Sequence, residues 1–322
     1  MAINFLDKSS GFEQINYLAS KKEPFIFIIS YDKSKIYVKE LSKLSGDIAY
    51  SFDCTKSINL NKRAYLKKYP ISYDTYLRAF NSVIEEIKNG NTYLLNLTFR
   101  TKIETNLTLA DIFAQAKAPY KLLIDNEFVC FSPECFVKIK DNTISTYPMK
   151  GTIDASIPNA KEIILNNKKE LAEHTMIVDL MRNDLNMVGF DTKVPSFRYI
   201  DKIKAGDKEL LQVSSKIEAK LPKNWYKNLG DILDTILPAG SITGTPKKKT
   251  IDIINNIETS KRALYTGVFG IFDGNCMQSA VMIRAISKDG DNLYYHSGGG
   301  ITIDSNPKME YQELLDKIYL PL

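Results

Sequence analysis

Two pairs of glutamates are the strongest chemical signal in this chain. Glu170 and Glu173 lie in one predicted helical region, and Glu310 and Glu313 lie in another. A spacing of three residues places both side chains of a pair on the same helix face. If the pairs faced each other, their repulsion would require a cation between them, and oxygen ligands favour Mg²⁺ over zinc. Ordinary solvated helix faces carry the same spacing, so both interpretations stay open from spacing alone.

Two further residues have the surroundings of catalytic groups. Glu134 follows the apolar run Phe128–Phe131, where a carboxyl group can have a raised pKa and act as a general acid. Lys150 lies at a strand end between Pro-Met and Gly-Thr, where partial desolvation would make its amine nucleophilic. A surface turn and a solvated lysine are the alternatives for these two positions.

Two segments rich in small residues are candidate anion sites. The loop Gly240–Gly244 leads into a helix at Pro246, and a predicted glycine loop, Ser297–Gly300, follows a strand. Free backbone N–H groups in such places bind anions, although simple turns would look the same. Neither segment matches a P-loop or a dinucleotide fingerprint.

Composition and charge exclude several classes of protein. The 43 Lys and Arg against 38 Asp and Glu give a net charge of +5 over 322 residues, which is too dilute to indicate a nucleic-acid partner. The two histidines, His174 and His296, are too few for a multi-histidine metal site. Four scattered cysteines, among them Cys54, form no CxxC pair and indicate a reducing, cytoplasmic location. We expect no signal peptide and no membrane span.

The predicted strands that must position these residues come in runs, with helices between the runs. Apolar residues from Tyr76 to Ile87 recur with the period of a helix that Asn89-Gly90 ends, and a long helical region covers 159–188. Residues 40–71 are weakly patterned and are expected to connect other elements. Further strands are expected near 24–30, 35–39, 264–272, 276–287, 292–296 and 300–303. Strands in runs, with helices between the runs, predict an α+β fold of antiparallel sheets flanked by helices.

Taken in order, several stretches resemble the chorismate-utilising enzyme family. They are FSPECF (131–136), YPMKGT (147–152), KELAEHTMIVDLMRNDL (169–185), PAGSITGTPKKKTIDIINNIE (238–258) and HSGGGITIDSNPKMEYQELLDK (296–317). The resemblance covers about residues 70–319. It implies antiparallel sheets packed face to face with helices outside, chorismate as substrate and Mg²⁺ as cofactor.

The resemblance also implies a role for particular residues. The metal set is Glu173 and Glu313, supported by Glu170 and Glu310 directly or through water. The groups expected to bind the substrate are Arg284, Lys317, Gly298, Gly299, Gly300, Thr243, Gly244 and Thr152. Cations and free N–H groups that meet carboxylates are the chemistry such a substrate requires.

Within the family, the Pro-x-Lys-Gly-Thr form resembles component I of the aminodeoxychorismate synthases. That branch uses the lysine matching Lys150 as a covalent nucleophile at C2 and the glutamate matching Glu134 as the acid for the leaving hydroxyl. Isochorismate and salicylate synthases have a lysine base where this chain has Leu94, and anthranilate synthases have alanine at position 150. Component I enzymes take ammonia from a glutamine amidotransferase subunit. Anthranilate synthase component I is the alternative enzyme, and a non-catalytic binding protein on this fold is a distant one.

Two departures from the family pattern stand out. Gln212 occupies a position where many relatives have histidine, and a glutamine cannot shuttle a proton. The region before the match is short, so residues 1–70 are expected to add strands to the catalytic domain 71–322. Relatives use a longer N-terminal part for a tryptophan pocket, which we do not expect here.

Overall fold

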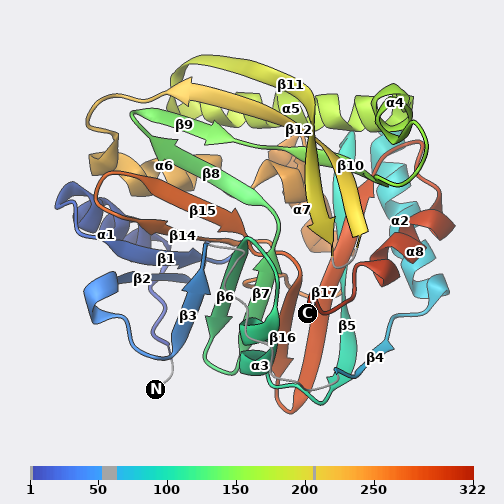
Figure 1. The fold of residues 1–322 in the computed structure, drawn as a ribbon, viewed down its shortest axis with the longest axis horizontal. Helices are drawn as coiled ribbons and strands as arrows, with labels where there is room; N and C mark the ends of the chain where they lie inside the picture. The colour runs from blue at the N-terminus through green and yellow to red at the C-terminus, as the bar shows by residue number, and fades with distance from the viewer. Residues whose placement is uncertain (1–2, 53–63, 206–207) are drawn as a thin grey trace.

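The computed structural model describes residues 3–52, 64–205 and 208–322. Within them the strands form two large sheets whose neighbouring strands all pair antiparallel (Figure 1). The first sheet runs in the order β10 (Met149–Asp154), β12 (Lys208–Lys220), β9 (Thr143–Thr146), β8 (Cys135–Lys140), β15 (Met277–Val281), β14 (Val268–Phe272), β1 (Phe25–Ile29) and β2 (Ile36–Glu40), and β11 (Phe190–Ala205) pairs with β12. The second runs β13 (Gly244–Thr245), β5 (Leu94–Thr105), β17 (Asn292–Ile301), β16 (Ala285–Asp289), β7 (Phe128–Ser132), β6 (Tyr120–Ile124) and β3 (Ile48–Ser51), and β4 (Leu66–Tyr69) pairs with β5.

The sheets share one apolar core, and helices cover their outer faces (Figure 1). Ile26, Leu122 and Phe269 meet in that shared core, and burial of a side chain of this size contributes about 1.5–3 kcal/mol. The helices are α1 (Lys8–Ser20), α2 (Tyr73–Lys88), α3 (Leu109–Gln115), α4 (Ala160–Asn166), α5 (Lys168–Val188), α6 (Leu229–Ile236), α7 (Lys247–Ile257) and α8 (Pro307–Asp316), with single 3₁₀ turns at Leu41–Lys43, Trp225–Asn228 and Gly240–Ile242. The expected α+β class, with packed antiparallel sheets and outer helices, is confirmed.

The N-terminal residues are part of the first sheet. Strand β1 pairs with β14 from Phe25 opposite Phe272 to Ile29 opposite Val268, and β2 pairs with its other edge. Helix α1, which the sequence patterning missed, packs against α6 on this sheet. The segment expected to be a connection contains strands β3 and β4, while its residues 53–63, including Cys54, lie outside the described residues.

The C-terminal meander differs from the expectation in two places. The strand predicted over 276–287 is two strands, β15 and β16, which belong to different sheets. The chain crosses between the sheets at 282–284, where Arg284 has a φ of +52°. Arg284 therefore lies in the crossing between β15 and β16 and not within a strand.

The glycine run is a strand and not the predicted loop. Strand β17 runs through Gly298, Gly299 and Gly300, which pair with Thr98, Leu97 and Asn96 of β5. A Cβ at Gly298 would lie 2.3 Å from the Leu97 carbonyl oxygen, so only glycine permits this approach of β5. Part of the backbone of this glycine run therefore pairs with β5 within the sheet.

No helix in the described ranges is long and apolar enough to span a membrane.

Candidate active site

The two glutamate pairs lie on two helices, α5 and α8, that are far apart in the chain. Glu170 and Glu173 lie in the first turns of α5, which the Asn167 side chain caps by accepting a hydrogen bond from the Glu170 N–H. Glu310 and Glu313 lie on α8, which packs on β17. Glu173 and Glu310 are both buried. The fold therefore brings together two helix faces that are 137 residues or more apart in the chain (310 − 173 = 137).

A lysine connects the two pairs. The Lys169 Nζ lies 3.7 Å from Glu173 Oε1 and 3.5 Å from Glu310 Oε1. The Glu310 Oε1 atom also accepts a hydrogen bond of 2.8 Å from the Ser305 hydroxyl. These distances show that Glu173 and Glu310 already converge on one positive charge. An all-carboxylate donor set of this kind has the chemistry that Mg²⁺ prefers.

The four carboxylates do not form a ready-made metal cage. In the described part of the chain, no three histidine, cysteine, aspartate or glutamate side chains are arranged to hold a metal ion. Lysines pair with the carboxylates instead, since Lys317 Nζ lies 2.6 Å from Glu313 Oε1. Burial and the neighbouring charge of Glu173 raise the pKa of Glu170, which shows how closely the acids are packed. The residues fit a hard cation by donor type, but a cation must replace ammonium groups to bind there.

The backbone of Gly299 and Gly300 lies beside these charged groups and forms the floor of the carboxylate site. A Cβ at Gly299 would lie 3.5 Å from both Glu310 Oε2 and Glu313 Oε1. A Cβ at Gly300 would lie 3.3 Å from the Lys150 Nζ. Side chains at these two positions would press against the charged groups, so the glycines leave room for them.

Lys150 reaches this floor from strand β10. Its Nζ donates a 3.0 Å hydrogen bond to Glu173 Oε2. Burial lowers the pKa of Lys150, but the carboxylates of Glu173, Glu170 and Glu313 together raise it by more, and the net shift is upward. In this arrangement Lys150 is an ammonium group. The neutral amine expected from desolvation alone therefore requires that Lys150 and Glu173 separate.

Glu134 lies in the turn between β7 and β8, and its surroundings favour the protonated form that a general acid needs. Burial raises the pKa of Glu134, although the Ser241 hydrogen bond and the charges of Lys150, Arg284 and Lys317 oppose the shift. The Ser241 hydroxyl donates a short hydrogen bond to Glu134 Oε1. Glu134 thus shares one electrostatic environment with the three cations expected to act on or bind the substrate.

The side chains of Arg284 and Lys317 differ in how well their N–H groups are hydrogen-bonded. The Lys317 Nζ donates to the Gly298 carbonyl at 2.7 Å, and burial lowers the pKa of Lys317. The Arg284 guanidinium donates a long 3.4 Å bond to the Lys317 carbonyl, while its Nε is buried without a hydrogen-bond partner. A buried donor without a partner costs about 1–3 kcal/mol, so Arg284 has unused capacity for an anion.

The remaining expected binding residues are placed differently. The Thr243 side chain is fully buried, and its hydroxyl donates to the Ala239 carbonyl at 2.8 Å. Gly244 has a φ of +131°, and a Cβ there would lie 2.0 Å from the Leu94 carbonyl oxygen. Thr152 is exposed on β10, opposite Gln212 of β12. The structure brings the glutamates, Lys150, Glu134, Arg284 and Lys317 together, whereas the Thr243 hydroxyl faces its own loop.

Neither histidine is available as a charged group near neutral pH. His174 is fully buried, its Nε2 lies 2.6 Å from the Ser215 hydroxyl, and burial lowers its pKa to about 4. His296 stacks on Tyr265 with ring centroids 4.9 Å apart, and burial also lowers its pKa to about 4. Proton transfer in this site therefore falls to the carboxyl and lysine groups.

Sequence reasoning missed three side chains that support the site. Ser241 belongs to the candidate anion loop, and nothing in its spacing identifies it as the partner of Glu134. Lys169 lies four residues before Glu173, and this spacing is a sequence signal for an ion pair. The Asn96 Nδ2 donates to the Ser241 carbonyl at 3.1 Å, and no spacing in the sequence connects those two residues.

A buried ion pair holds the loop that carries Ser241. The Arg262 Nη2 lies 2.7 Å from Glu258 Oε1, and both side chains are almost wholly buried. Arg262 also donates to the Ile242 carbonyl at 2.9 Å and to the Asn96 carbonyl at 2.6 Å. Glu258 accepts from the backbone and hydroxyl of Thr98. The pair therefore joins α7, β5 and the 240–242 turn.

We expect Arg262→Met to lower the free energy of unfolding by about 3–5 kcal/mol, because it leaves the Glu258 charge buried without its partner. Denaturant titration of the purified chain measures this. The control is Arg182→Met, because the Arg182 and Asp179 side chains form an exposed pair and its loss should cost about 1 kcal/mol or less. Equal losses in the two variants would contradict the role assigned to Arg262.

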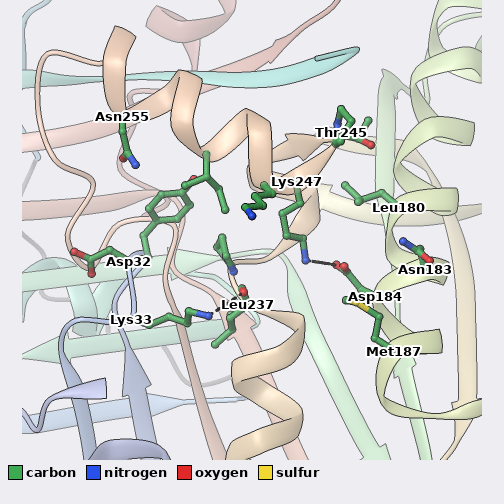
Figure 2. A pocket seen from close by; sticks show the side chains of 15 residues that line it. Asp32, Lys33, Leu180, Asn183, Asp184, Met187, Leu237, Thr245, Lys247 and Asn255 are labelled. Carbon is green, nitrogen blue, oxygen red and sulfur yellow. Dashed lines mark hydrogen bonds and ion pairs between the residues drawn. The ribbon is translucent and has the colours of Figure 1, made fainter. Parts of the chain in front are cut away.

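A separate cavity of about 630 Å³ is lined by residues on both sides of this loop, Leu237 and Pro238 before it and Thr245 and Pro246 after it (Figure 2). It is lined by the end of α5, the start of α7 and the turn at Asp32 and Lys33. In Figure 2 the Lys247 side chain points across it to Asp184, with Nζ 2.7 Å from the carboxylate. None of the residues expected at the active site lines this cavity, so its size says nothing about the chemistry described above.

Comparison with known proteins identifies the family of this chain. The sequence model of the chorismate binding enzyme family matches residues 26–322. An uncharacterized PabA-like protein of Haemophilus influenzae is 52% identical over 96% of both chains. Aminodeoxychorismate synthase component 1 of Bacillus subtilis is 31% identical over 78% of this chain, which spans about 55% of that enzyme's length.

Two further comparisons concern the branch and the fold. Anthranilate synthase component 1 of Saccharolobus solfataricus is 30% identical over 91% of this chain and 70% of its own length. Overall identity therefore does not separate the two branches. The menaquinone-specific isochorismate synthase MenF of Escherichia coli has the same fold, with a TM-score of 0.73, 15% identity, and coverage of 98% of this chain and 82% of its own.

Proposed function

The chain belongs to the chorismate-binding enzyme family, and we propose that it aminates chorismate at C4 to give 4-amino-4-deoxychorismate. It is a chorismate-utilising enzyme, and the proposal concerns which reaction it performs. The observation that carries the proposal is Lys150, which reaches the floor of the carboxylate site from β10 and shares the surroundings of Glu134. An anthranilate synthase has no use for a lysine there, because it would crowd the path of ammonia to C2.

The reaction needs a nucleophile and an acid acting at the same time. The neutral Lys150 amine forms a bond to C2 of chorismate, both ring double bonds shift by one position, and the C4–O bond breaks. Glu134 gives its proton to the departing hydroxyl, which leaves as water, because expulsion of free hydroxide from carbon is very slow. Ammonia then attacks C4, both double bonds shift back, and the C2–N bond to Lys150 breaks. The new C4 nitrogen gives a proton to the Glu134 carboxylate, which restores the acid.

The remaining residues bind and orient the substrate in this proposal. Arg284, with its unused buried Nε, and Lys317 receive the carboxylates of chorismate. Glu173 and Glu313, with Glu170 and Glu310, are proposed to hold Mg²⁺, whose charge when bound would offset a substrate carboxylate. Before the attack, Lys150 must leave Glu173 and lose its proton.

Ammonia is proposed to come from a glutamine amidotransferase subunit. The name of the Bacillus subtilis relative, component 1, supports a second component for this chain. Free ammonium can replace that partner in a first test, so the amination reaction does not depend on finding it.

Product analysis tests the proposal directly. The purified chain is incubated with chorismate, Mg²⁺ and ¹⁵N-labelled ammonium, and the products are separated and identified by mass. We expect labelled 4-amino-4-deoxychorismate. Anthranilate with pyruvate, or isochorismate, as the only product would overturn the proposal. Salt-sensitive DNA binding without any turnover of chorismate would instead favour a non-catalytic binding protein.

A further inference from the structure

Lys169 differs from the other lysines of the site in its exposure. Its side chain is 42% exposed, whereas the side chains of Lys150 and Lys317 are 24% and 27% exposed. The two carboxylates that Lys169 joins are only 8% and 7% exposed. Lys169 therefore lies on the solvent side of two buried acids.

The contacts of Lys169 are also the weakest of the three. Its Nζ lies 3.7 and 3.5 Å from carboxylate oxygens, compared with 3.0 Å for Lys150 and 2.6 Å for Lys317. Lys317 is additionally held by the Gly298 carbonyl. A lysine is a point charge on a flexible stem, so Lys169 can turn into water at little cost while Lys150 and Lys317 stay in place.

The position of Lys169 is that of a bridging cation. It joins Glu173 of α5 to Glu310 of α8, and these belong to the two pairs proposed to share Mg²⁺. Without a positive charge between them, the two buried carboxylates would repel each other. Glu173 would keep Lys150 as a partner, whereas Glu310 would keep only the Ser305 hydroxyl. One ammonium group bridging both acids supplies that charge.

We propose that Lys169 is a displaceable counter-cation, which holds Glu173 and Glu310 together in the metal-free protein and competes with Mg²⁺ for them. This inference rests on the Mg²⁺ site in the proposed function, and it is independent of which product forms. It has two consequences. Removal of the Lys169 charge strengthens Mg²⁺ binding, because a competitor is lost, and it destabilises the metal-free protein, because two acids lose their shared partner.

Calorimetric titration with Mg²⁺, in the absence of chorismate, tests the first consequence. We expect Lys169→Met to bind Mg²⁺ about twofold to fivefold more tightly than the wild type, which is the range that exposed ion pairs of this kind support. Lys168→Met is the matched control, because it removes the same charge from the exposed neighbouring position. Lys169→Arg keeps the charge and should bind Mg²⁺ like the wild type.

Thermal unfolding tests the second consequence. In EDTA, Lys169→Met should melt about 1–3 °C below the wild type and below Lys168→Met, and saturating Mg²⁺ should remove the difference. The proposal is overturned if Lys169→Met binds Mg²⁺ no more tightly than Lys168→Met, if its melting temperature in EDTA is unchanged, or if the wild type binds no Mg²⁺. None of these outcomes bears on C4 amination, which the product analysis tests by itself.

Discussion

A Lys150→Ala variant is expected to lose formation of 4-amino-4-deoxychorismate by a factor on the order of 10³ or more, as when other enzymes lose a covalent nucleophile. The reason is geometric as well as chemical. The Lys150 Nζ lies beside Gly300, where an added Cβ would be 3.3 Å from it, and Gly300 is one of the residues proposed to bind the substrate. Without it, ammonia must act on chorismate directly, so the residual product should shift towards anthranilate chemistry.

The measurement has a readout that a structural role for Lys150 would not produce. When ammonium is withheld, the wild type should accumulate a protein adduct whose added mass equals chorismate less one water, located at Lys150 by peptide mapping. Lys150→Ala should show no adduct, and Lys168→Met, changed at an exposed position outside the site, should keep it. Unchanged C4 amination in Lys150→Ala would disprove the covalent step.

Glu134→Gln is the second variant with a large expected effect. It should reduce kcat for amination by about 10²–10⁴-fold, because the leaving hydroxyl loses its proton donor while the side chain keeps its shape. Glutamine can still accept the Ser241 hydrogen bond, so the loop geometry should be preserved. If Glu134→Gln kept the wild-type kcat, Glu134 would not be the general acid.

The pH dependence of this variant has a definite sign. Burial raises the pKa of Glu134, and only the protonated form can act as an acid. Wild-type activity should therefore fall as the pH rises through that raised pKa, and Glu134→Gln should lack this descending limb.

Stability should change in the opposite direction to activity. A carboxyl group whose pKa is raised on folding binds protons more readily in the folded state, so its ionisation costs stability as the pH rises above the unfolded value of about 4.3. Glu134→Gln removes this cost and should melt at a higher temperature than the wild type at neutral pH. The two melting temperatures should converge in acid, and a lower melting temperature at neutral pH would contradict the assignment.

Local patterns predicted most elements of the fold but not their partners. The helix from Tyr73 to Lys88 follows directly from the 3.6-residue apolar period and its Asn89-Gly90 end. The strands from 276 to 289 read as one because each is short and apolar, yet β15 and β16 pair with β8 and β7 in different sheets. The sheet to which a strand belongs depends on contacts with strands that are distant in the chain. A window of neighbouring residues contains no information about those contacts.

The glycine run shows the same limit at the site. Three successive glycines are typical of a loop, and only the approach of β5 explains why they form a strand. The missed supports of the site follow this pattern, since Asn96 and Ser241 are 145 residues apart and meet only through folding.

By itself the sequence determined the residue types that matter: two Glu-x-x-Glu helix faces, an acid beside an apolar run, and a lysine before Gly-Thr. Residue type and local spacing follow directly from the chain, and so does the resemblance to a family. The tertiary structure alone decided the charge state and the partners of those residues. Lys150 is an ammonium bound to Glu173, and Lys169 bridges two helices, because burial and proximity set a pKa and an ion pair, and both are properties of the folded chain.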